Sequence, residues 1–147
     1  MATRSRLVAS AFAIVLVTGC TDDILDASYA NRAEVEADEA IGRGWVPEWL
    51  PAEARQIREV HNVDTNESAL AFQLPGGSNW RPPSPCTPAE GANFRQPRFN
   101  REWIPELNSR AVYFRCPSEE DTRMSTVEAV AVLPGGEQVL HWRSFAR

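Results

Sequence analysis

The sequence has no lysine, two histidines and three cysteines among its 147 residues. All 15 basic residues are therefore arginines, and the 20 acidic residues that outnumber them give a formal net charge of -5. Nucleic acids and anionic lipid surfaces repel such an acidic chain, so neither is an expected partner. Histidine pairs and Cys-x-x-Cys pairs with the spacing of a zinc site are absent, and we expect neither a metal nor a cofactor.

The motifs of common enzymes are missing as well. The sequence contains no Gly-x-Ser-x-Gly elbow and no phosphate-binding loop. A hydrolase that uses His61 or His141 stays as an alternative. Catalysis of that kind needs a nucleophile, a base and an orienting group together, and the sequence predicts that the protein is not an enzyme.

One long apolar run is present, Leu7–Val17, and Arg4 and Arg6 precede it. Basic residues followed by a short apolar run are typical of a secretory signal peptide. The run is shorter than the roughly 20 residues that a permanent membrane helix needs. We expect residues 1–19 to be removed, which leaves 13 basic and 20 acidic residues and a formal charge near -7.

The run ends in Val17-Thr18-Gly19-Cys20, which resembles the lipobox of bacterial lipoproteins. The resemblance implies that Cys20 becomes the first residue and carries diacylglycerol and an N-linked acyl chain such as palmitate, which together anchor the chain in a membrane. Thr21, in place of an aspartate, is similar to the sorting pattern that favours the outer membrane, facing the periplasm. The alternative is a soluble secreted protein in which Cys20 has this position by chance.

With Cys20 assigned to the lipid, the other two cysteines, Cys86 and Cys116, are left to pair with each other. An exported chain enters an oxidising compartment, so we predict a disulfide between them. Closing this loop would stabilise the domain by about 3 to 4 kcal/mol. Two free thiols or a metal site are the alternatives, although neither cysteine has a histidine nearby in the sequence.

Hydrophobic periodicity predicts a single α+β domain over residues 28–147, behind a lipidated tether over residues 20–27. Alanines spaced three and four apart predict an amphipathic helix from Ser28 or Asn31 to Gly44. Period-two alternation predicts an antiparallel sheet of about five strands: a hairpin over 56–74 and strands over 110–116, 126–133 and 138–145. We expect the helix to cover one face of this sheet, and a long proline-rich loop over 75–97.

Tryptophans are the candidate binding residues. Trp45 and Trp49 lie in the run Gly44–Pro51, where two prolines favour a stiff, extended connector. This connector covers one edge of the core or presents an aromatic binding surface, since tryptophan is enriched in both settings. Trp80, in the proline-rich loop, docks on the core or meets a partner.

A polar cluster at the predicted hairpin turn is the most reactive-looking stretch: His61, Asp64, Thr65, Asn66 and Glu67. His61 with Asp64 suggests a metal site or a catalytic pair. One histidine and one carboxylate fall short of the ligand count of zinc or calcium sites, however. Side-chain hydrogen bonds that shape a turn explain Asp64 and Asn66 equally well.

Several stretches together resemble one family of small bacterial lipoproteins. Gly44–Pro51, Ile57–Asn66, Phe114–Cys116 and a closing strand with Trp142 are similar to the YbbD head domain family, over nearly all of the chain after Cys20. The resemblance implies a non-enzymatic envelope domain and supplies no catalytic residues. We therefore expect an envelope-anchored interaction module with a protein partner. The alternative is an inhibitor or immunity-like lipoprotein that neutralises a basic protein by charge.

Overall fold

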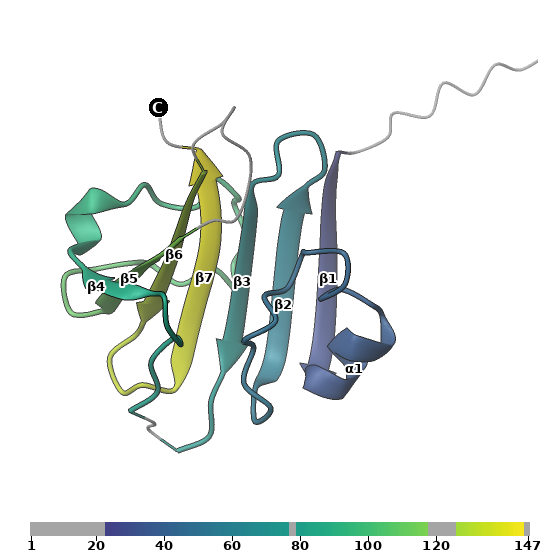
Figure 1. Cartoon of the computed structure of the whole chain (residues 1–147), viewed down its shortest axis with the longest axis horizontal. Helices are drawn as coiled ribbons and strands as arrows, with labels where there is room; N and C mark the ends of the chain where they lie inside the picture. The colour runs from purple at the N-terminus through teal and green to yellow at the C-terminus, as the bar shows by residue number, and fades with distance from the viewer. Residues whose placement is uncertain (1–22, 77–78, 118–125, 146–147) are drawn as a thin grey trace, which may run out of the picture.

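In the computed structural model, which describes residues 23–76, 79–117 and 126–145, the chain forms a seven-stranded antiparallel sheet. In sequence order the strands are β1 (Ile24–Asn31), β2 (Arg55–Asn62), β3 (Ser68–Gln73), β4 (Thr87–Ala89), β5 (Val112–Cys116), β6 (Thr126–Val132) and β7 (Gln138–Phe145). Their order across the sheet is β1-β2-β3-β7-β6-β5-β4 (Figure 1). The long strand β1 and the three-residue strand β4 are therefore its edges.

The predicted α+β fold, with five strands and an amphipathic helix, is wrong. The helix α1 spans six residues, Arg32–Ala37, and a single 3-10 turn, η1 (Gly91–Asn93), is the other helical segment of the described residues. Asn31 caps α1 by accepting a hydrogen bond from the Glu34 N–H, and Glu39, at a φ of 57°, takes a left-handed conformation just beyond it. Val35 is the buried residue of α1. A short helix depends on packing against the core, and a stripe of alanines buries too little apolar surface to extend this one.

Strand β1 accounts for the rest of this error. It takes residues expected in the tether and at the start of the helix, and it pairs with β2 from Ile24 opposite Asn62 to Asn31 opposite Arg55. Tyr29 is buried while Asp26 is exposed, so β1 follows the two-residue alternation of a strand. The signal peptide, Cys20 and the first tether residues lie outside the described residues.

Other predicted strands are confirmed. The hairpin is formed by β2 and β3, and the C-terminal meander by β5, β6 and β7. Pairing of β3 with β7 joins the two units into one sheet. The proline-rich loop is less irregular than expected, since it contains β4 and η1. Pro88 is tolerated in β4 because this strand pairs on one side only.

Each face of the sheet has its own cover. One face, here called the arm face, lies under α1 and the arm, Gly44–Pro51, from which Val46 and Leu50 are buried in its core. The opposite face lies under the cover loop, Phe94–Ala111, whose Phe94, Trp103 and Leu107 pack on a second apolar cluster. Both covers are loops, so the sheet is buried on two sides with little helix.

Candidate functional site

A carboxylate and a histidine are buried together on the arm face. Glu59 and His61 both belong to β2, two residues apart, so they point to the same side of the sheet. Nδ1 of His61 lies 2.8 Å from one carboxyl oxygen of Glu59 and 3.0 Å from the other. Trp45 of the arm covers this pair, and its ring stacks on the imidazole of His61 at 4.1 Å between centroids. The guanidinium of Arg43 lies over the ring of Trp45, at 4.1 Å from its centroid.

Burial decides the protonation of this pair. It raises the pKa of Glu59 to about 8, with a further contribution from the negative charge of Asp26. It also lowers the pKa of His61, and the nearby charge of Arg43 acts in the same direction. At neutral pH Glu59 is therefore protonated and donates to Nδ1 of a neutral imidazole. Both groups are kept out of water, Glu59 at 1% exposure and His61 at 5%.

A second carboxylate–histidine pair lies on the same face, across strands. His141 of β7 contacts Glu128 of β6, with 2.6 Å between Nε2 and the carboxyl oxygen. Trp49 of the arm meets the His141 ring edge-on, at 5.3 Å between centroids. Each tryptophan of the arm thus covers one histidine.

The two pairs differ in the charge of the carboxyl group. Burial pushes the pKa of Glu128 upward, but the hydrogen bond and the charge of His141 outweigh it, so that this pKa is lowered. The side chain of Glu128 is 13% exposed, against 1% for Glu59. Glu128 is consequently an ionised carboxylate that reaches solvent, with His141 behind it.

Asp64, predicted to act with His61, lies elsewhere. It is exposed in the β2–β3 turn, and its backbone N–H and that of Thr65 both donate to the side-chain oxygen of Asn62, at 2.9 Å. Asn62 therefore shapes the turn, and His61 takes Glu59 as its partner. Within residues 23–76, 79–117 and 126–145, no three His, Cys, Asp or Glu side chains form a possible metal site.

The three candidate tryptophans of the binding surface face the protein. Trp80 contacts Trp49 at 5.7 Å and the buried Phe72 at 5.8 Å between ring centroids. Trp49 and Trp80 are partly buried against the arm-face core, and Trp45 is partly buried over His61. Of the two interpretations of the arm, this geometry favours a cover for the core.

Beside the arm lies an open cleft of about 550 Å³. Its walls come from the arm, from the loop before β4 and from the ends of β5, β6 and β7, and the disulfide forms part of them. Four charged residues line it: Arg43, Glu48, Glu128 and Arg143. A volume between about 300 and 1,000 Å³ is typical of ligand sites.

Hydrogen bonds fix one wall of the cleft. The Arg143 guanidinium donates to the side-chain oxygen of Asn66 at 3.0 Å and to the carbonyl of Gly44 at 3.5 Å. These bonds tie β7 to the β2–β3 turn and to the arm. On the other side, the predicted disulfide between Cys86 and Cys116 is confirmed, and it fastens the loop before β4 to the end of β5.

The residues that the sequence analysis missed are charged residues within apolar strands. Glu59 follows the two-residue alternation of Ile57 and His61, which places it on their face of the strand, yet a carboxylate alone gives no signal of its partner. Glu128 and Arg143 are directly opposite each other in the β6–β7 register. That relation depends on the register of the β6–β7 hairpin, which the sequence analysis did not use to pair individual residues.

The part of the chain that forms β1, α1, the arm, β2 and β3 is also the part with recognisable relatives. Residues 23–73 match the YbbD head domain. The resemblance expected from the sequence is confirmed there, including the arm and the Glu59–His61 pair. The YbbD head match ends at Gln73, so Phe114–Cys116 and Trp142 lie outside it. No curated protein and no solved structure matches the chain. The YbbD head match supports a non-catalytic domain.

Among the described residues, no helix has the length and apolar character needed to cross a membrane.

Proposed function

We propose that this protein is a lipoprotein anchored through Cys20 whose folded domain is a non-catalytic binding module for an envelope or secreted protein. The observation that carries the proposal is the cleft between the arm and the disulfide. It is open to solvent, is held by a covalent bond on one side and by the hydrogen bonds of Arg143 on the other, and presents charges of both signs.

The charges of the cleft indicate the chemistry of the partner. Arg43 and Arg143 are balanced by Glu48 and Glu128, and Trp49 and the disulfide supply apolar surface between them. Such a lining suits a protein segment that carries both acidic and basic side chains. An inhibitor that neutralises a basic protein would gain more from an acidic cleft, so this lining favours the general binding module over that alternative.

The two buried histidines support a non-catalytic role. A general base must come within hydrogen-bonding reach of its substrate. His141 is 1% exposed and His61 is 5% exposed, and each imidazole is covered by a tryptophan of the arm. The hydrolase alternative would need the arm to leave both rings, which would uncover the core beneath Val46 and Leu50.

The proposed location follows from the sequence before β1. A lipid on Cys20 would place the domain at a membrane surface, and Thr21 favours the outer membrane with the domain facing the periplasm. β1 begins at Ile24, so few residues separate the lipid from the sheet. A partner of this domain would therefore be met close to the membrane.

Site-specific cross-linking in intact cells tests the proposal. A photoreactive residue is placed at Glu48, in the cleft, and as a control at Glu53, which is exposed outside it. We expect one protein to be cross-linked from position 48 and not from position 53, as identified by mass spectrometry. The purified partner should bind the full chain in detergent, and Glu48→Arg should weaken this binding by about tenfold while Glu53→Arg does not. The same adducts from both positions, or none from position 48, would contradict the proposal.

A further inference from the structure

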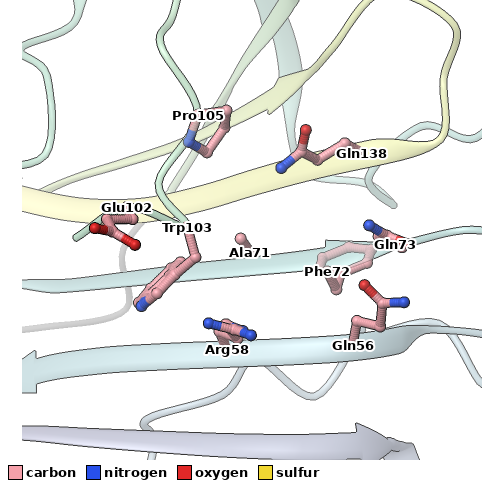
Figure 2. Close-up of a pocket in the computed structure, with 9 residues that line it drawn as sticks. All are labelled: Gln56, Arg58, Ala71, Phe72, Gln73, Glu102, Trp103, Pro105 and Gln138. Carbon is pink, nitrogen blue, oxygen red and sulfur yellow. The ribbon is translucent and has the colours of Figure 1, made fainter.

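The other face of the sheet carries a groove of about 470 Å³ that the cleft does not include. It lies between the cover loop and the strands β2, β3 and β7. Figure 2 shows three glutamines at one end of it, each from a different strand: Gln56, Gln73 and Gln138. At the other end, the indole of Trp103 extends from the cover loop over β3, near Arg58.

The lining identifies the class of ligand. Each glutamine offers an amide donor and an amide acceptor, a combination that pairs with hydroxyl and acetamido groups. Trp103 is partly buried and provides an aromatic surface for the C–H face of a ring. Arg58 and Glu102 contribute one charge of each sign, so the groove attracts neither anions nor cations overall. Amides at one end, an aromatic ring at the other and no net charge between them suit a neutral saccharide.

The sheet itself argues against a peptide strand in this groove. Peptides that bind by strand addition need a free strand edge. β2, β3 and β7 are each paired with a strand on both sides, so none of them offers a free edge. A ligand in the groove therefore meets side chains.

Backbone strain at Gln56 is independent support for ligand binding in the groove. Arg55 pairs with Gln73 and Arg58 pairs with Ala71, so two residues of β2 oppose one residue of β3 in a bulge. Gln56 lies in this bulge at a φ of 48°, a conformation that side chains other than asparagine, aspartate and glycine rarely adopt. Strained residues of this kind cluster at ligand sites. We propose that the groove is a binding site for a neutral oligosaccharide. It lies on the opposite face from the cleft and does not depend on the function proposed above.

Titration of the full chain with neutral tetrasaccharides tests this site. The probes are chitotetraose, cellotetraose and maltotetraose, at millimolar concentration, in a detergent without a sugar headgroup. We expect saturable binding of at least one probe, measured by calorimetry. Gln73→Ala combined with Gln138→Ala should weaken it by about tenfold, because two amide partners are lost. Gln96→Ala, an exposed glutamine of the cover loop outside the groove, is the matched control and should leave the affinity unchanged.

Gln56→Gly separates binding from folding. Glycine adopts a positive φ without strain, so this variant should keep or raise the Tm while it weakens saccharide binding. A Gln56→Gly variant with wild-type affinity would overturn the proposal, since the strain would then serve the fold alone. Failure of all three probes to bind, or equal loss in Gln96→Ala and in the double variant, would overturn it as well.

Discussion

Nδ1 of His61 lies 2.8 Å from a carboxyl oxygen of Glu59, and Trp45 seals both groups from water. The pair holds one proton on the carboxyl group, because burial raises the pKa of Glu59 to about 8 and lowers that of His61. The ordinary values are 4.5 for glutamate and 6.5 for histidine. Folding therefore reverses the order in which the two groups lose their protons.

The free energy of unfolding should depend on pH through this pair. Near pH 6.5 the unfolded chain begins to release the proton of His61, and its Glu59 carboxyl group is already ionised, since both groups have their ordinary pKa values there. Above pH 6.5 the unfolded chain releases its proton, whereas the folded pair keeps its own until about pH 8. The folded state then binds more protons, and stability should fall by about 2 kcal/mol between pH 6.5 and 8.

Urea denaturation at pH 6, 7 and 8 measures this slope, and Glu59→Gln assigns it. The glutamine amide can donate to His61 at any pH, so this variant should show no loss of stability above pH 6.5. Glu53→Gln removes an exposed carboxyl group and should keep the wild-type slope. A Glu59→Gln variant that still loses stability above pH 6.5 would show that another group causes the dependence.

The disulfide should matter for stability more than any single contact of its loop. Cys86 and Cys116 are 30 residues apart, and closing a loop of that length restricts the unfolded chain. We expect the Cys86→Ser, Cys116→Ser double variant to lose about 3 to 4 kcal/mol in chemical denaturation. Reduced wild-type protein should match it. Equal stability with and without reductant would contradict the prediction.

Strong alternation of apolar and polar residues along the strands made much of the sheet predictable. Leu70 and Phe72 of β3, and Leu74 just after it, follow a two-residue period, and the prediction of this hairpin from sequence was right because these three side chains are apolar and buried. β1 gave no such signal, since it is an edge strand with Asp26 and Ser28 exposed. Its small residues also fitted the spacing of a helix, and the pairing with β2 decided between the two.

The binding sites were harder to predict than the strands. The tryptophans of the arm are visible in the sequence, but the direction of their rings depends on the two histidines beneath them. Likewise, Gln56, Gln73 and Gln138 are ordinary polar positions until the register brings them to one end of a groove. Sequence patterns report burial, whereas a site depends on pairing between distant strands.

Close packing makes Gly91, the first residue of η1, a position that is sensitive to a larger side chain. A Cβ added at Gly91 would come within 2.5 Å of the ring of Tyr113, a buried residue of β5. We expect Gly91→Ala to lower the free energy of unfolding by about 1 to 3 kcal/mol, because the ring or the loop must shift. Gly42→Ala is the control, since its nearest contact would be an ordinary 3.5 Å. Equal free energies of unfolding of the two variants would show that the Tyr113 ring moves aside without loss of stability.

Membrane attachment should depend on Cys20 alone. Replacing it by serine removes the thiol that would receive diacylglycerol, and the described residues contain no helix able to replace the anchor. We expect Cys20→Ser, expressed behind a signal peptide whose removal needs no lipidated cysteine, to move the protein from the membrane fraction to the soluble fraction after cell lysis. Cys86→Ser, which also removes one thiol, should stay with the membrane. The intact mass of the wild-type protein would show the added acyl chains on Cys20. A wild-type protein without added mass would instead be a soluble secreted domain, and its partners would then be met away from the membrane.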